Sequence, residues 1–492
     1  MNAFSRRGAC PALSAPMQTG DGLLVRLNPV AGGLTPKALI GLCESALRHG
    51  NGIMEVTARG SLQIRGLTAE SARLLAAEVD ALEIVVRRGV PVETGPLAGI
   101  DPQEIEDPRP VAEWIRAAIE EVGLTPRLGP KVSVLVDGGG QFTMDALTAD
   151  VRLKAVQAAD GIQWSVSVAG NARSAKALAV VDADAARDIT VAALRMVAEK
   201  GREAHTRDLS ARQLNSLARW HSVPPPSVLP DISPARGEIA LSSAASPISI
   251  AVRGEPAPTL PISPLAGEMS GRTEGGAKER QPTRSPIGLF DLANRHALGI
   301  GLPFGSMPAQ FLIELFGQAL QLGTTEIRLA PGRALLFLGL SASACDSLQA
   351  SAAALGFVTS PADPRTRIAA CPGAPACASG RIATRAIAET IASESADLFD
   401  PSLTLHISGC AKGCAHPGPA ALTIVGDENG AGLVVDGTAK ALPAGYRPGY
   451  DAARGVTGIL AAVRAQRHQG ETVAACLTWL GAAGIAELYR RN

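Results

Sequence analysis

One order of expected secondary structure occurs twice in this chain of 492 residues. The first copy consists of a strand, a helix, two strands and a second helix, at 23–27, 35–49, 53–56, 62–66 and 69–82. Its strands alternate apolar and polar side chains, and Thr35 is a residue type that caps helices. This β-α-β-β-α order predicts half of a ferredoxin-like layer.

The same order returns after residue 296, with 299–303 as the matching strand and 309–322 as the matching helix. The segment 325–328 then corresponds to 54–57, which places Glu326 where the first copy has Glu55. The segment 335–340 corresponds to 62–67. Two copies predict a pseudo-twofold arrangement with a shared site near the axis. The alternative is a fortuitous match, because this order is common and the identity between the copies is low.

Four of the eight cysteines form two tight pairs, Cys371-x5-Cys377 and Cys410-x3-Cys414. Iron–sulfur clusters are held by four thiolates. A spacing of i and i+4 can place the sulfurs of the second pair on one side of a helical turn. Glycines around both pairs allow backbone to approach a bulky inorganic group, namely Gly373, Gly380, Gly409 and Gly413.

Three other interpretations of these cysteines remain open. Structural zinc usually has C-x2-4-C pairs, which the five-residue gap fits poorly. A disulfide framework suits a short secreted chain rather than this one. Buried single cysteines also occur in cores by coincidence, although they rarely come in glycine-rich pairs.

The paired spacing resembles the cluster signature of the sulfite and nitrite reductase superfamily. The run from His406 to Pro417, His-Ile-Ser-Gly-Cys-Ala-Lys-Gly-Cys-Ala-His-Pro, is most similar to the precorrin-3B synthase branch. Reductases usually carry Asn near the position of Lys412. The resemblance implies an α+β fold, with duplicated ferredoxin-like half-domains and two α/β sirohaem-reductase-type lobes.

The expected domains follow from this resemblance and from composition. A stretch rich in Pro, Ser and Gly has little apolar pattern and is expected to be disordered. The expected order is a first half-domain, a first tetrapyrrole-binding lobe, the disordered insert, a second half-domain and an iron–sulfur lobe, at 1–95, 96–221, 222–287, 288–358 and 359–492.

The segment 57–65 resembles the reductases' Thr-x-Arg-x-x-x-Gln run, which faces a tetrapyrrole. The resemblance assigns Thr57, Arg59 and Gln63 to substrate binding, and guanidinium groups suit the carboxylates of a precorrin. Arg65 alternates onto the strand face of Gln63, although a solvated surface charge explains it better.

Residues 128–133 look like the reductases' Pro-Lys-Phe-Lys segment, so Lys131 is a further substrate-binding candidate. Ser133 stands where the second lysine would be, and the expected upstream arginine has no match at its usual spacing, although Arg87 and Arg88 lie earlier. Fewer positive groups argue against a sulfite or nitrite pocket. Lys412, between two cluster cysteines, is either a substrate or cluster contact or a solvated side chain.

The resemblance implies a cytoplasmic precorrin-3B synthase, a monooxygenase that hydroxylates precorrin-3A at C20 with O2 and closes the ring A acetate γ-lactone in aerobic cobalamin biosynthesis. Its cofactor would be a 4Fe-4S cluster held by Cys371, Cys377, Cys410 and Cys414. An additional mononuclear iron is an option, with His406 and His416 as candidate ligands or as structural histidines. The catalytic residues are not identified. An external electron donor, either an NADH-linked reductase or a ferredoxin, is expected.

Two other functions compete. A sulfite or nitrite reductase would carry sirohaem, and a non-catalytic protein would hold zinc at the four cysteines. The 46 Lys and Arg residues balance the 46 Asp and Glu residues, so the chain has no net charge that would favour binding to nucleic acid. No apolar run approaches 18 residues and no signal peptide is evident, so no membrane association is expected.

Overall fold

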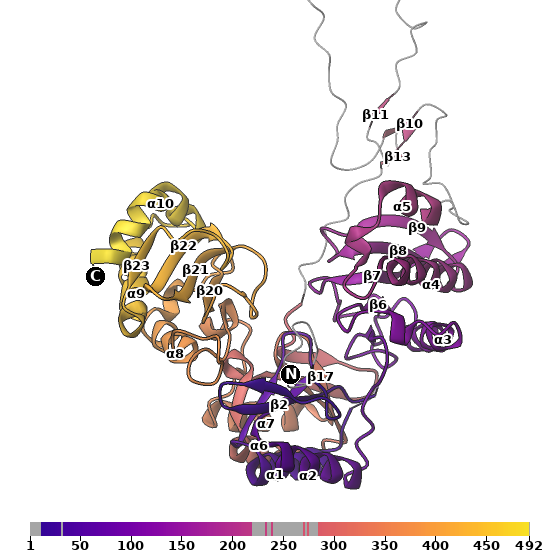
Figure 1. Cartoon of the computed structure of the whole chain (residues 1–492), viewed down its shortest axis with the longest axis horizontal. Coiled ribbons are helices and arrows are strands. Elements are labelled where there is room, and N and C mark those ends of the chain that lie inside the picture. Colours follow the sequence, from indigo (N-terminus) through magenta and orange to yellow (C-terminus); the bar gives the residue numbers. More distant parts are fainter. Residues whose placement is uncertain are drawn as a thin grey trace, which may run out of the picture.

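The structure is a computed structural model, and it describes residues 11–30, 33–218 and 284–491. It also describes two small hairpins, formed by β10 (Ile232–Ser233) with β11 (Glu238–Ile239) and by β12 (Met269–Ser270) with β13 (Thr273–Glu274). Apart from these strands, the predicted insert at 222–287 lies almost entirely outside the described residues. In the described part, no helix is long and apolar enough to cross a membrane. Figure 1 shows a central module, which consists of the two half-domains described below, flanked by two lobes.

The first half-domain is built as expected. Its strands lie in the order β1 (Met17–Thr19), β2 (Gly22–Leu27), β4 (Leu62–Leu67), β3 (Ile53–Val56), and its helices are α1 (Pro36–His49) and α2 (Ala69–Ala81). Thr35 caps α1, because its hydroxyl accepts a hydrogen bond from the backbone N–H of Ala38. The apolar faces of both helices pack beneath the sheet, which leaves the other sheet face for the lobes.

The second half-domain repeats this order. Its elements are β14 (Gly288–Asp291), β15 (His296–Gly301), α6 (Ala309–Gln321), β17 (Glu326–Ala330), β18 (Ala334–Leu340) and α7 (Ala342–Ala354). The sheet order β15-β18-β17 copies β2-β4-β3. The predicted match of Glu326 with Glu55 was wrong. Arg328 lies opposite Leu336 as Glu55 lies opposite Gln63, so Arg328 is the residue equivalent to Glu55 and the match is shifted by two residues.

The halves exchange strand pairings across a pseudo-twofold axis. β16 (Ser306–Pro308), just before α6, pairs with β3 of the first half through Met307 and Met54. In return Leu34, just before α1, forms a bridge with Ile327 of β17. One apolar core therefore fills both halves, with residues of α1 and α6 in the same cluster.

The first lobe contains a five-stranded sheet in the order β5 (Val92–Thr94), β6 (Val134–Asp137), β7 (Ala149–Ala158), β8 (Gly161–Gly170), β9 (Lys176–Val181). The first two pairings are parallel and the last two antiparallel. The lobe's helices are α3 (Pro108–Glu121), α4 (Ala183–Lys200) and α5 (Ala211–Ala218). Strand β7 was not predicted, and α4 is capped by Asp182, whose side chain accepts a hydrogen bond from the backbone N–H of Ala185.

The second lobe has the same topology. Its sheet order is β19 (Ile368–Ala370), β20 (Leu405–Ser408), β21 (Ala420–Asp427), β22 (Gly430–Gly437), β23 (Gly445–Arg447), again two parallel and then two antiparallel pairings. Its helices are α8 (Thr384–Glu394), α9 (Ala452–Gln466) and α10 (Val473–Arg491). Helix α10 is interrupted by a kink at Gly481, which has non-helical backbone angles and separates the segment that ends at Leu480 from the one that follows. The duplication therefore includes the lobes.

Short 3-10 helices join several of these elements. They are η1 (Thr125–Arg127), η2 (Thr206–Asp208), η3 (Pro303–Gly305), η4 (Pro364–Arg367), η5 (Ala396–Leu398) and η6 (Gly449–Asp451).

The two equivalent sheet faces differ in chemistry. In β18, Leu336 and Leu338 join an apolar cluster with Leu135 and Phe142 of the first lobe. The equivalent positions of β4 hold polar groups, Gln63 and Arg65, which face the second lobe. Only the first half-domain therefore offers a polar sheet face to the lobe that carries the cysteine pairs.

Candidate functional site

Both cysteine pairs begin where neighbouring parallel strands end. Cys371 follows β19, and Cys410 follows β20 by one residue, Gly409. The backbone N–H of Gly409 donates a hydrogen bond to Cys371 Sγ at 3.2 Å. A Cβ at Gly409 would lie 3.1 Å from the Cα atoms of Gly373 and Gly380. The two cysteine loops therefore pack backbone to backbone, and only glycine fits this contact.

The four paired cysteines lie close enough to influence one another. Burial raises the pKa of the Cys414 thiol, and the charges of Cys371, Cys410 and Cys377 raise it further. The second pair does not lie on a helical turn as predicted, because residues 409–415 form bends and turns. Gly413 provides a left-handed residue, with φ of 63°, between Cys410 and Cys414.

The donor set of these loops fits a cluster. Four thiols come from two loops that meet through glycine backbone, and Gly409 directs an N–H at one sulfur. Such donors are among the groups that tune iron–sulfur clusters. Among the described residues, no three His, Cys, Asp or Glu side chains are placed to hold a single metal ion.

The first cysteine loop rests on the edge of the first half-domain. Arg65 of β4 and the backbone N–H of Gly20 both donate to the carbonyl oxygen of Ala376, which precedes Cys377. A Cβ at Gly20 would lie 2.6 Å from the carbonyl oxygen of Pro375. The turn between β1 and β2 therefore comes into close backbone contact with this loop.

Glu55 is the centre of a buried polar network on the sheet face. Its side chain is 3% exposed and lies 3.6 Å from Arg65. It accepts a hydrogen bond from Gln63 at 2.8 Å and forms an ion pair with Arg385 of α8. Gln63 accepts in turn from Arg26 at 2.6 Å. The predicted residue Gln63 thus lies on the polar face, within a network that reaches the second lobe.

Arg65 is more deeply buried than a solvated surface charge would be. Its side chain is 4% exposed and pairs with Asp21 at 3.0 Å. Burial lowers the pKa of Arg65, but the hydrogen bond that Arg65 donates to Asp21 and the charges of Glu55 and Asp21 outweigh it, so the net shift is upward. Arg65 is therefore a structural cation of the interface between the two units.

Thr57 and Arg59 belong to the turn between β3 and β4. The Thr57 hydroxyl accepts a hydrogen bond from the backbone N–H of Ser61 and so closes this turn. Arg59 reaches the first lobe, where it pairs with Glu93 at 2.7 Å and donates to the carbonyl oxygen of Thr148. Its guanidinium also lies 3.4 Å from Ser133 Oγ, at the position where reductases carry a lysine.

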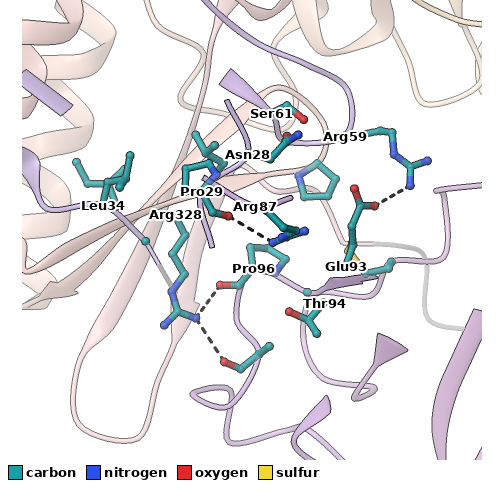
Figure 2. A pocket seen from close by; sticks show the side chains of 18 of the residues that line it. Asn28, Pro29, Leu34, Arg59, Ser61, Arg87, Glu93, Thr94, Pro96 and Arg328 are labelled. Carbon is teal, nitrogen blue, oxygen red and sulfur yellow. Dashed lines mark hydrogen bonds and ion pairs between the residues drawn. The ribbon is translucent and has the colours of Figure 1, made fainter. Parts of the chain in front are cut away.

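A cavity of about 150 Å³ lies where this turn meets the first lobe. Figure 2 shows Arg59 and Glu93 on one side and Arg328 on the other, where Arg328 donates to the carbonyl oxygens of Pro96 and Ala98. Arg87 also lines it and donates to the carbonyl oxygen of Pro29. The charged residues of its lining are four arginines and Glu93, and arginines are suited to bind an acidic ligand.

The two predicted lysines occupy exposed positions. Lys131 lies on the surface at the start of the segment that leads into β6. Lys412 donates from Nζ to Ser379 Oγ at 2.8 Å, and this contact is exposed. Lys412 thus joins the two cysteine loops on their outer side, while its role toward a substrate remains a prediction.

His406 is fully buried beside the second cysteine loop. Neither ring nitrogen has a hydrogen-bond partner among the described residues. Its ring packs edge-on against His416, with 5.7 Å between ring centroids. Burial lowers the pKa of His406 to about 4, helped by His416 and Arg333, so the ring is neutral at pH 7.

Three charged residues of this region had not been predicted as functional: Glu55, Arg333 and Arg385. Glu55 could have been found, because it pairs with the predicted Gln63 across two strands. Arg385 lies 330 positions from its partner Glu55, and no local pattern connects them. Arg333 stands in a turn whose equivalent in the first half-domain is glycine.

The fold and the cysteine loops define a protein of the nitrite and sulfite reductase structural class, which points to an iron–sulfur or sirohaem-type cofactor. Residues 15–82 match the nitrite/sulfite reductase ferredoxin-like half domain. The chain is also similar in structure to the NirA protein of Mycobacterium tuberculosis, with a TM-score of 0.65 and 17% identity over 94% of this chain and 84% of that one. This likeness concerns the fold alone.

A precorrin-3B synthase from Sinorhizobium sp. is 37% identical over 490 residues, which cover 100% of this chain and 96% of the relative. The chain belongs to the precorrin-3B synthase family. This finding confirms the predicted family and fold class and identifies the chain as an enzyme. The expected domain boundaries and the roles of individual site residues stay predictions.

Proposed function

We propose that this protein is a precorrin-3B synthase that hydroxylates precorrin-3A at C20 and closes a γ-lactone from the ring A acetate. One atom of O2 enters the product and the other leaves as water, so two electrons and two protons are consumed. The electrons come from an external donor, an NADH-linked reductase or a ferredoxin. The full-length relative is the observation that carries this proposal.

A four-iron cluster held by Cys371, Cys377, Cys410 and Cys414 would supply the electron transfer. The gathering of these thiols supports it, because each affects the pKa of Cys414. The protein itself brings the cysteine loops against the polar sheet face of the first half-domain. A tetrapyrrole bound on that sheet face would lie next to the cysteine loops that would hold the cluster.

The substrate carries many carboxylates, and the basic groups of the central module are suited to bind them. Arg59 would bind one carboxylate by exchanging its bond to Glu93 for a bond to the substrate. Gln63 would orient the ring system from the sheet face, while Thr57 keeps the turn closed. Lys131 and Lys412, at the edge of the site, are weaker candidates for further carboxylates.

The decisive experiment is anaerobic purification followed by iron, sulfide and absorption analysis, and then by addition of precorrin-3A, a reductant and O2. We expect roughly four iron and four sulfide per chain, no haem band, and a product heavier by one oxygen atom. A haem band with turnover of sulfite or nitrite would assign the protein to the reductases. Zinc alone, without any turnover, would exclude a redox function.

A further inference from the structure

Each half-domain sends one arginine to a cysteine loop of the second lobe. Arg65 of β4 donates to the carbonyl oxygen of Ala376, directly before Cys377. Arg333, in the turn before β18, donates to the carbonyl oxygen of Ala415 at 3.0 Å, directly after Cys414. The central module therefore contacts both loops in the same way, because in each case a guanidinium donates a hydrogen bond to the carbonyl oxygen of a residue next to a cysteine.

The charge of the first arginine is neutralised locally. Arg65 pairs with Asp21 at 3.0 Å and lies 3.6 Å from Glu55. Glu55 is buried and Asp21 is half-buried, and both lie close enough to the guanidinium to cancel most of its field. The contribution of Arg65 to the first loop is therefore mainly its hydrogen bond.

The second arginine is not neutralised in this way. No carboxylate lies within ion-pair distance of Arg333 among residues 11–30, 33–218 and 284–491. Burial lowers the pKa of Arg333, and the charge of Arg385 lowers it further. Placing a cation in a half-buried position without a carboxylate partner costs free energy, so a functional role would explain this residue.

The backbone also carries a cost at this position. Arg333 has a φ of 67°, and its equivalent in the first half-domain, Gly60, has a φ of 81°. A left-handed conformation is unfavourable for a residue that carries a Cβ. The side chain passes over Gly305, where a Cβ would lie 2.8 Å from Arg333 Cδ. Glycine would be the easier choice for the turn, yet the chain places a half-buried cation there.

We propose that Arg333 provides a fixed positive charge that raises the reduction potential of the cluster, whereas Arg65 only holds the first cysteine loop in place. A cluster becomes more negative by one charge when it accepts an electron, so a nearby uncompensated cation favours the reduced form. Arg333 acts through the cluster and is a positioning residue rather than a catalytic one. This inference rests on the proposed four-cysteine cluster.

The test is a redox titration of the purified holoenzyme, followed by electron paramagnetic resonance of the reduced cluster. Arg333→Gln should keep the iron and sulfide content but shift the midpoint to a more negative potential. Arg333→Lys should stay near the wild-type value, because it keeps the charge. Arg333→Gly removes the charge and also the left-handed strain, so it should fold well and show the same negative shift as Arg333→Gln.

Arg65→Gln should behave differently. It leaves Asp21 and Glu55 without their cation, so we expect reduced iron content and lower stability, which Arg333→Gln should not show. Arg464→Gln, which removes an exposed arginine, is the control for the procedure and should change neither quantity.

An unchanged midpoint in both Arg333→Gln and Arg333→Gly would overturn the proposal, as would a shift in Arg333→Lys as large as in Arg333→Gln. An Arg333 variant that alters only the KM for precorrin-3A would make this residue a substrate contact instead. A wild-type protein without iron would contradict the cluster itself, which is a separate failure.

Discussion

Arg385 of α8 and Glu55 of β3 form an ion pair at 2.5 Å although they belong to different domains of the fold. Glu55 is almost completely buried, and it also approaches Arg65 and binds Gln63. The pair joins the cysteine-bearing lobe to the sheet face that is expected to hold the tetrapyrrole. Its strength therefore affects both stability and the relative placement of the two sites.

Glu55→Gln should destabilise the protein by roughly 2–4 kcal/mol, because two arginines lose their shared buried partner. Urea unfolding followed by circular dichroism measures this change. Asp397→Asn is the matched control, since it breaks an exposed pair with Arg464 and should cost less than about 1 kcal/mol. Equal losses in the two variants would mean that Glu55 is not a buried centre.

Gly409→Ala should lower the iron content of the purified protein. Its Cβ would lie 3.1 Å from two backbone Cα atoms, and backbone cannot move aside as a side chain can. Gly317→Ala in α6 is the control, because no atom lies within 4 Å of the added Cβ there. Full iron content in both variants would contradict the tight packing of the cysteine loops.

Arg59→Gln should weaken precorrin-3A binding about tenfold, the loss expected when a charge-assisted contact worth roughly 1.5–3 kcal/mol is partly replaced by water. Glu93→Gln should bind at least as tightly as the wild type, because Arg59 no longer has to leave a carboxylate. Anaerobic titration of the substrate would measure both constants. Weaker binding in Glu93→Gln would show that the ion pair itself shapes the site.

The stability of the first lobe should depend on pH through Glu104. Burial raises the pKa of Glu104 to about 7, a hydrogen bond from Gly99 opposes this, and Asp101, Asp107 and Asp137 raise it further. The folded state therefore binds this proton more tightly than the unfolded state, whose pKa is 4.5. The free energy of unfolding should fall as the pH rises from about 4.5 to beyond 7.

Glu104→Gln removes this titration, so its stability should vary less than that of the wild type over the same range. Urea midpoints at pH 5 and pH 8 provide the measurement. A wild-type protein that is more stable at pH 8, relative to Glu104→Gln, would have the opposite sign and would contradict the buried-carboxyl assignment.

The repeated fold was predictable because its signals are local. Alternating strands, the capping residue Thr35 and the glycine after α1 each act within a few residues of the chain. The match between 62–67 and 335–340 also held, because both strands fill the same core. The match of Glu326 with Glu55 failed, since strand register depends on partners that a single segment does not reveal.

The candidate site was predictable only in part. The cysteine pairs carry their own spacing, but the contacts that hold them depend on Arg65, Arg333 and Arg385, which come from distant segments. Arg65 looked like a surface charge because nothing in its neighbourhood indicates that Ala376 will cover it. Strand β7 was missed, although it forms the centre of the first lobe.

The exchanged pairings of Met307 with Met54 and of Leu34 with Ile327 determine how the chain could be divided into two fragments that still assemble. The two repeats share these pairings and a common core. Two separately expressed fragments, each carrying one repeat, should therefore find each other and assemble as a heterodimer. The ancestral state of such a chain would then be a pair of identical subunits.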